Sequence, residues 1–226
     1  MAKDVSLAWR FVKGRGVWAT LRVLAQLFGH GRRDWIVTEG LLPGPPPEPD
    51  PGGIVFREAT DEDLGYLDSL TPHRRPEVLR ARIRDDGCLL YVARDGRRIV
   101  AFRLVGPAPT HYARFLRLDQ FLQLAGNDLF VHEVFTHPDY RNRGIGRRLS
   151  LASDQLLVER GCRRHVSLIR IRNLPSLRMA FRKGTRPILH ISSVGFLFFR
   201  RYRVSRTMPA RVLAVLAQAT RAPDRP

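Results

Sequence analysis

Two hydrophobic periods alternate along the middle of the chain, and their order predicts an α/β domain. Runs rich in aliphatic and aromatic residues between turn residues predict strands over 53–60, 88–106 (a hairpin that turns at Asp95-Gly96), 128–137, 164–171 and 195–204. Apolar residues three and four apart predict helices after Thr60 and over 76–86, 111–126, 144–161, 174–184 and 209–218. This order, with one strand–helix–strand crossover around residue 150, is typical of α/β domains.

The first 53 residues are expected to lie outside this domain. Residues 5–29 have helical spacing, and one face is apolar: Val17, Leu21, Leu24, Phe28. Two interpretations stay open, a helix that packs on the domain or a basic amphipathic helix on an anionic membrane. Six prolines between Pro43 and Pro51 predict a stiff, extended linker. The expected division is a helical extension over 1–40, a linker over 41–53, the domain over 54–204, and a short helix with a disordered tail over 205–226.

Charge divides the chain into two unequal halves. The formal net charge is +18. Residues 141–226 hold 20 Lys/Arg against three acids, whereas residues 1–140 are nearly balanced. A field of that sign attracts a polyanionic cofactor, an anionic substrate or an acidic membrane surface. All but three of the 39 basic residues are arginine, a bias that a GC-rich genome also produces, so charge alone does not predict a nucleic-acid partner.

Cysteine spacing and hydropathy predict neither a metal site nor a membrane span. Cys88 and Cys162 lie far apart and match no metal-ligand spacing, so we expect free thiols in a reducing cytoplasm and no metal. No apolar run reaches the ~18–20 residues of a spanning helix. Lys13, Arg15 and Arg22 interrupt the apolar positions that a signal peptide would need. The expected location is cytoplasmic, with peripheral contact at the inner face of the membrane through residues 5–29 as an open alternative.

The stretch THPDYRNRGIGRRL, residues 136–149, predicts a phosphate-binding turn. It joins a strand end to a helix start, where unpaired backbone amides and a partial positive charge favour phosphate. Glycines let the backbone approach an oxyanion closely, and arginines add charge: Arg141, Arg143, Arg147, Arg148. Leu149 stands where the Rossmann pattern has its third glycine, and the sequence contains no Gly-Lys-Ser/Thr. Neither classical nucleotide-binding pattern is therefore favoured.

The segment EVFTHPDYRNRGIGRRL resembles the acetyl-CoA motif of the GNAT superfamily of N-acetyltransferases, in its bacterial form. The family pattern Arg/Gln-x-x-Gly-x-Gly/Ala is matched by residues 141–146, and His137-Pro138-Asp139-Tyr140 is a typical lead-in. A second segment, NLPSLRMAFRKGT, resembles the family helix that follows the fifth strand, with matches at Asn173, Ser176, Arg178, Ala180 and Gly184. Arg182 stands for the usual Lys there, and Thr185 for the usual Phe. The resemblance covers about residues 53–204.

The resemblance implies a GNAT-type α/β fold, with a mixed, mostly antiparallel central sheet, helices on both faces and a splayed strand pair that holds acyl-CoA. It implies acetyl-CoA as co-substrate. The backbone of Val134, Phe135 and Thr136 would bond the pantetheine arm. The pyrophosphate would lie on the turn and the head of the helix, formed by Arg141, Asn142, Arg143, Gly144, Ile145, Gly146 and Arg147. Asn173 and Ser176 would contact the cofactor between strands four and five, although Asn173 could equally serve only as a helix cap.

Direct acetyl transfer to an amine needs a base that removes a proton from the amine and an acid that protonates the leaving thiolate. Glu133 is the candidate base, because it lies in an apolar strand where desolvation raises a carboxyl pKa. A solvent-facing Glu133 is the plain alternative, and His132 and His137 are alternative bases. We expect His132 to point to the opposite face from Glu133. The family's usual tyrosine is replaced by Ala180, so Tyr202, Tyr140 or water would act as the acid.

The leading interpretation is a cytoplasmic, basic N-acetyltransferase that acetylates a small-molecule or peptide amine. The apolar stripe of residues 111–126, which includes Tyr112 and Phe115, is interpreted as packing or as a channel for an acyl chain. A longer-chain acyltransferase that uses acyl-CoA or acyl carrier protein near a membrane is therefore an alternative. A protein of another class, which binds nucleic acid or acetyl-CoA without catalysis, is a further one, although nucleic acid is disfavoured because no RNA- or DNA-binding motif is present. The sequence does not predict the oligomeric state.

Overall fold

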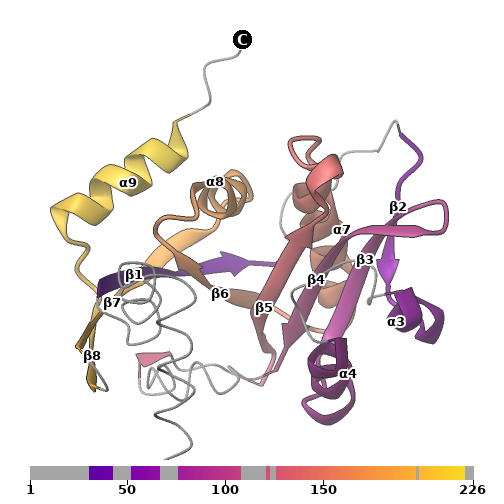
Figure 1. Cartoon of the computed structure of the whole chain (residues 1–226), viewed down its shortest axis with the longest axis horizontal. Helices are drawn as coiled ribbons and strands as arrows, with labels where there is room; N and C mark the ends of the chain where they lie inside the picture. Colours follow the sequence, from indigo (N-terminus) through magenta and orange to yellow (C-terminus); the bar gives the residue numbers. More distant parts are fainter. Residues whose placement is uncertain are drawn as a thin grey trace, which may run out of the picture.

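In the part of the chain that the structure describes, eight strands form one mixed sheet (Figure 1). The computed structural model describes residues 31–42, 52–66, 76–107, 121–122, 126–196 and 199–221. The strands are β1 (Gly31–Leu41), β2 (Val55–Glu58), β3 (Leu89–Asp95), β4 (Arg98–Gly106), β5 (Asp128–Thr136), β6 (Arg164–Arg170), β7 (Arg186–Phe196) and β8 (Phe199–Ser205). Their order is β2-β3-β4-β5-β6-β1-β7-β8, and only the β5–β6 pair is parallel.

Helices cover both faces of this sheet (Figure 1). The helix α7 (Ile145–Glu159) connects β5 to β6 and packs on β3, β4 and β5 through Leu149 and Leu157. Two further helices, α8 (Leu174–Arg182) and α9 (Ala210–Thr220), cover Ile36 of β1 on the same face. The opposite face carries α3 (Asp61–Tyr66) and α4 (Pro76–Asp85), where Leu79 packs on β3 and β4. The expected sheet, mostly antiparallel with helices on both faces, is therefore confirmed.

The strand β1 corrects the predicted domain boundary. We expected residues 1–40 to form a helical extension, yet Gly31–Leu41 lies inside the sheet between β6 and β7. Its central residues Trp35, Ile36 and Val37 are 4%, 0% and 0% exposed and face both sides of the sheet. A strand that is buried on both faces lacks the polar–apolar alternation that identifies surface strands. A short apolar run such as this one does not distinguish a strand from a helix.

Other predicted elements lie near their expected positions or outside the described residues. The α9 helix occupies the predicted C-terminal segment, and the strand predicted over 195–204 consists of the end of β7 and all of β8. The predicted helix over 5–29, the proline-rich stretch over 43–51 and most of the segment 111–126 lie outside the described residues. Among the described helices, none is long and apolar enough to cross a membrane.

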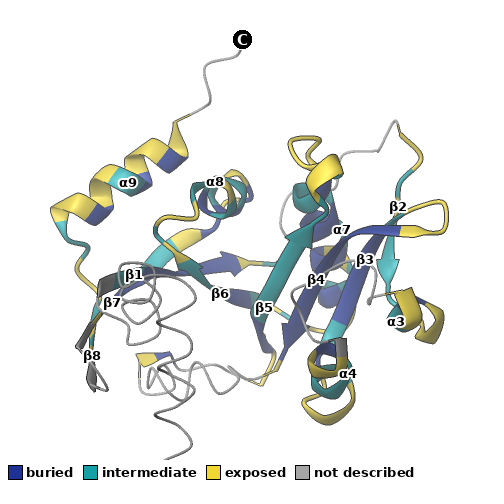
Figure 2. Ribbon diagram, viewed as in Figure 1, coloured by how far each residue is buried: buried dark blue, intermediate teal, exposed yellow. Residues whose placement is uncertain are grey.

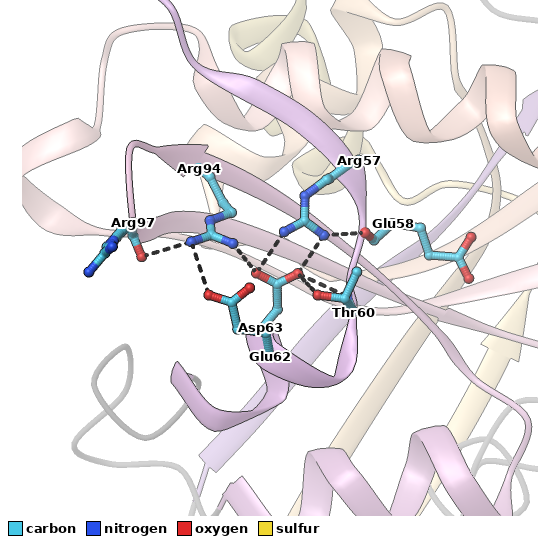
Figure 3. Close-up of polar contacts among 7 residues, drawn as sticks. All are labelled: Arg57, Glu58, Thr60, Glu62, Asp63, Arg94 and Arg97. Atoms are coloured by element: carbon cyan, nitrogen blue, oxygen red, sulfur yellow. Dashed lines mark hydrogen bonds and ion pairs between the residues drawn. The ribbon is translucent and has the colours of Figure 1, made fainter.

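The buried carboxylate of Asp63 fixes α3 to the outer strands (Figure 3). Its Oδ2 accepts a hydrogen bond from the Thr60 amide at 2.8 Å and pairs with Arg57 of β2 at 2.6 Å. Its Oδ1 pairs with Arg94 of β3 at 3.1 Å. Burial acts to raise the pKa of Asp63, but the hydrogen bonds from Thr60 and Arg57 outweigh burial and hold that pKa below its usual value. The Asp63 carboxylate thus bonds the N-terminus of α3 and one arginine from each of two strands.

We predict that Ile36→Ala lowers the free energy of unfolding by about 2–5 kcal/mol, because it leaves a cavity between β1, α8 and α9. Urea unfolding of the purified chain measures the change. The matched control on the same strand is Leu41→Ala, whose side chain is 66% exposed and should cost less than about 0.5 kcal/mol. Equal, small effects of the two changes would show that β1 does not belong to the core.

Candidate functional site

The strand β5 is central in the sheet but only half-buried over most of its length. From Val131 to Thr136 each residue is intermediate in exposure, whereas its neighbour β4 is buried after Arg98 (Figure 2). The cause is a short seam with β6, which holds four residue pairs from Asp128↔Arg164 to Val131↔Ser167. Beyond it the two strands diverge (Figure 1). We call this region, residues 132–136 of β5 and 168–170 of β6, the strand split.

The edge of β5 at the strand split has no ladder partner in β6. On its other side, Val134, Phe135 and Thr136 pair with β4. Backbone N–H and C=O groups that leave a ladder need another partner or water. A ligand with amide groups, such as a pantetheine arm, can supply that partner in a strand-like manner. The strand split thus fits the predicted role of Val134–Thr136.

A β-bulge at His132 turns two neighbouring side chains to one face. The bulge lies between two regular pairs of β4 and β5, Leu104↔Glu133 and Val105↔Val131. Glu133 therefore shares a face with the core beneath α3 and α4, to which its pair partner belongs. The ring of His132 lies on this face as well, because a Cβ on Gly106 would be 2.8 Å from His132 Nε2 and 2.5 Å from Cys88 Sγ. The expectation that His132 and Glu133 point to opposite faces is wrong.

Burial keeps His132 neutral. Burial, with a smaller contribution from Arg82 and against the opposing effect of Asp86, lowers the pKa of His132 to about 4. Among the described residues, its Nε2 is buried without a hydrogen-bond partner. A pKa this low makes the neutral His132 ring a weak proton acceptor near neutral pH. The face therefore holds two of the predicted bases, Glu133 and His132.

The phosphate turn, residues 141–146, has the backbone shape of an anion site. Asn142 has a φ of 62° and Gly144 a φ of 74°, and Asn142 is the only described non-glycine residue with a positive φ. Left-handed residues in a turn direct successive N–H groups toward one concave side. Gly144 is the N-cap of α7 and provides no side-chain acceptor for the first amides of the helix. Arg141 and Arg143 are exposed beside these amides.

Side chains around the turn fix it to the β3–β4 hairpin. The hydroxyl of Tyr140, at the end of the 3-10 turn η2 (Pro138–Tyr140), donates to Asp95 at 2.7 Å. Arg98 and Arg143 lie against the Tyr140 ring at 5.7 and 5.2 Å from its centre. Arg98 also contacts His137 Nε2 at 2.9 Å. These contacts occupy His137 and Tyr140, which weakens their roles as alternative base and acid.

Gly146 brings β5, α7 and α8 close together at the head of α7. A Cβ at this position would lie 3.0 Å from Thr136 Oγ1 and 3.6 Å from Met179 Sδ. Asn173, the N-cap of α8, accepts a hydrogen bond from the Ser176 amide at 3.4 Å. This distance is long for a hydrogen bond, so the exposed Asn173 side chain caps the helix weakly. Capping and a contact with a ligand are compatible at this residue.

The structure separates Tyr202 from Glu133. Tyr202 lies on β8, and β6, β1 and β7 lie between that strand and β5. At ~4.8 Å per strand the two residues are about 19 Å apart across the sheet. At this distance the predicted role of Tyr202 as general acid is not supported. The sequence did not show the separation, because the order of strands in a sheet cannot be read from their order along the chain. Ala180 of α8, at the position where the family has tyrosine, has no proton to donate.

Titratable residues that the motifs do not predict meet beneath α7, from four different elements: Arg103, Asp154, His165, Lys183. The one signal in the sequence is an arginine inside the apolar run IVAFRLVG of β4. A charge there requires a buried partner, but the sequence does not say which acid. Within the described part of the chain, no group of three His, Cys, Asp or Glu side chains could hold a metal ion.

Comparison with known proteins identifies the family. The model of the family described as acetyltransferase (GNAT) matches residues 55–184, more than half of the chain. The chain belongs to the GNAT family. The match begins at β2 and ends just after α8, so it includes the strand split, the phosphate turn and Asn173 but not β1. No curated protein matches this GNAT chain.

Solved structures of GNAT proteins share the fold. A GCN5-related N-acetyltransferase from Sphaerobacter thermophilus has a TM-score of 0.52 and 18% identity, and the match covers 84% of this chain and 56% of that one. An acetyltransferase of the GNAT family from Novosphingobium aromaticivorans DSM 12444 has a TM-score of 0.51 and 18% identity, with 79% and 66% covered. The GNAT chain thus spans less than two thirds of each of these relatives. At this identity the likeness shows the fold alone.

We predict that the His132 ring does not titrate between pH 5 and 8, because burial lowers its pKa to about 4. The unfolded chain binds a proton there near pH 6.5, so this group adds stability above that pH and loses it as the pH falls toward 4. Histidine NMR signals followed over this range measure the titration, and His132→Gln assigns the signal. A midpoint near 6.5 would contradict the buried position.

Proposed function

We propose that the chain transfers an acetyl group from acetyl-CoA to an amine, by direct attack of the amine on the thioester. The observation that carries this proposal is the combination of a β5 edge at Val134–Thr136 that lies beyond the β6 ladder with a helix start that has no side-chain cap at the adjacent phosphate turn. One feature suits an amide-rich arm and the other suits a pyrophosphate. Membership of the GNAT family supports the same cofactor.

The residues that would hold the cofactor follow from this arrangement. The backbone of Val134–Thr136 would bond the pantetheine amides along the strand split. The amides of residues 142–146 would donate hydrogen bonds to the pyrophosphate, with charge from exposed Arg141 and Arg143 and from Arg147 in the first turn of α7. Asn173 and Ser176 would meet the cofactor from α8. Bound there, acetyl-CoA supplies an activated acyl group as a thioester.

Glu133 is the proposed base. Its position opposite Leu104 directs it to the face of α3 and α4, away from the helices α7 and α8 that flank the cofactor turn. An amine that approaches from this face would meet Glu133, which removes a proton from it, directly or through water. His132, at the bulge, lies on the same face but is a weaker proton acceptor, because burial lowers its pKa to about 4. Water protonates the thiolate in this proposal, because the described part of α8 places no tyrosine there.

We predict that wild-type protein binds acetyl-CoA and that Gly146→Leu binds it at least tenfold more weakly. The added side chain would fill the space between Thr136 and Met179, which the cofactor arm requires. Gly144 is less suited to this test, because its Cβ would point into open space. Isothermal titration calorimetry measures both dissociation constants.

The matched control for this titration is Gly65→Leu, which adds the same side chain on exposed α3 with no atom within 4 Å of the new Cβ. It should bind as wild type does. If wild type shows no heat with acetyl-CoA, the proposed function is wrong. If Gly146→Leu binds normally, the cofactor does not pass the head of α7.

We predict that Glu133→Gln lowers kcat/KM by roughly 10²–10⁴-fold, the usual contribution of a general base, and leaves the dissociation constant of acetyl-CoA within about twofold. A panel of primary amines and peptides, assayed by release of free thiol, measures turnover. His132→Gln is assayed in parallel. If His132→Gln loses activity and Glu133→Gln does not, His132 and not Glu133 is the general base. Cofactor binding without turnover in the wild type on every amine tested would favour the non-catalytic alternative.

A further inference from the structure

An ion cluster lies buried between the sheet and α7. Asp154 of α7 is 2% exposed, and its Oδ1 pairs with Arg103 of β4 at 2.6 Å. Its Oδ2 pairs with Lys183 at 2.5 Å, and His165 Nδ1 of β6 lies 3.6 Å from Oδ1. Arg103 also donates to the Ser150 carbonyl at 2.9 Å and to Ser153 Oγ at 2.5 Å, both on α7. One carboxylate on α7 therefore contacts side chains from three other elements, β4, β6 and the end of α8.

The cluster connects the two halves of the sheet behind the strand split. Arg103 comes from β4 and is paired with Val134, in the segment proposed to bond the cofactor. His165 comes from β6, on the other side of the four-pair seam. Because that seam is short, contacts through α7 add a second link between β4–β5 and β6. Asp154 provides such a contact on each side.

The same cluster fixes α8 against α7. Lys183 is the C-cap of α8, and Met179, one helical turn earlier, is the residue that approaches Gly146. The two helices therefore meet at two places, an ion pair at Asp154–Lys183 and a close approach at Gly146–Met179. The second place lies next to Thr136, at the end of the β5 segment along which the cofactor arm is proposed to bind. A shift of α8 at the ion pair would change that space.

Charge in the cluster is unbalanced. Burial lowers the pKa of His165 to about 3, so the imidazole is neutral. Asp154 stays ionised, because Arg103 and Lys183 outweigh its burial and lower its pKa to about 2. One carboxylate thus faces two cations. Burial, with Arg103, lowers the pKa of Lys183 to about 7 against the pull of Asp154.

We propose that Lys183 is a positioning residue for the cofactor: its ammonium, held by Asp154, sets the spacing of α8 and α7 at the head of the strand split. The inference rests on the proposed function, because it concerns the same acetyl-CoA site. Lys183 itself does not touch the cofactor in this proposal. It acts through α8, at the distance of one helical turn from Met179.

The proposal gives opposite pH trends for affinity and stability. As the pH rises through 7, Lys183 loses its proton, the ion pair becomes a weaker hydrogen bond from a neutral amine to the Asp154 carboxylate, and acetyl-CoA binds more weakly. The unfolded chain keeps this proton up to about pH 10.5, so between pH 7 and 10.5 it binds more protons than the folded chain. The free energy of unfolding therefore rises over that range. A role in stability alone would not make cofactor affinity fall where stability increases.

The experiment measures acetyl-CoA dissociation constants by calorimetry from pH 6 to 9, with urea unfolding at each pH. Lys183→Met keeps the apolar stem and removes the charge. We expect it to bind about tenfold more weakly than wild type at pH 6, the size of one lost charged hydrogen bond. The difference should shrink by pH 9. Lys183→Arg keeps its positive charge over this range, so its acetyl-CoA affinity should not fall as the pH rises through 7.

The matched control is Arg163→Met, which removes one exposed cation before β6, at the end of the sheet away from the phosphate turn. Its acetyl-CoA dissociation constant should change with pH as that of the wild type does. The cofactor's 3′-phosphate also titrates, near pH 6, but equally in every variant. If wild type binds and its affinity is unchanged from pH 6 to 9, or if Lys183→Met matches it, the inference is wrong. If wild type does not bind at any pH, the proposed function is wrong instead.

Discussion

The short parallel seam between β5 and β6 is the constraint on which the rest of the structure depends. Four residue pairs join these strands, and both then continue without each other. A sheet normally satisfies its backbone groups by continuous pairing, so a split in its middle leaves polar groups that favour a ligand able to pair like a strand. The same divergence opens beside the start of α7, where the phosphate turn presents uncapped amides. One departure from regular pairing therefore creates both halves of the proposed cofactor site.

A split sheet needs other connections to remain one unit. At the bottom of the seam, Arg164 bonds Asp128 of β5 and also Glu39 of β1, the latter at 3.1 Å. Above it, the buried Asp154 receives side chains from β4, β6 and the end of α8. Ion pairs of this kind cost desolvation and add little net stability. Their geometry is directional, however, and directional contacts suit a place where two helices must hold a fixed spacing beside a ligand.

The β-bulge at His132 places both candidate bases on one face of the sheet. Regular alternation would place His132 and Glu133 on opposite faces. The extra residue instead puts both toward α3 and α4. The phosphate turn leads into α7 on the opposite face. The proposed phosphate site and the proposed proton acceptors thus lie on different sides of one strand, an arrangement that would let an acceptor amine approach without displacing the cofactor.

The sequence by itself determined the features that depend on near neighbours. The spacing of apolar residues predicted most strands and helices. The segment RNRGIG within THPDYRNRGIGRRL predicted the phosphate turn, because its glycines, its arginines and the following helix are contiguous in the sequence. The tertiary structure alone decided what depends on strand order and register. It placed β1 between β6 and β7, separated Tyr202 from Glu133 by three strands, and brought Asp154 to Arg103 and Lys183. The physical reason is that pairing across a sheet joins residues over 100 positions apart, a choice set by the whole core and not by any local pattern.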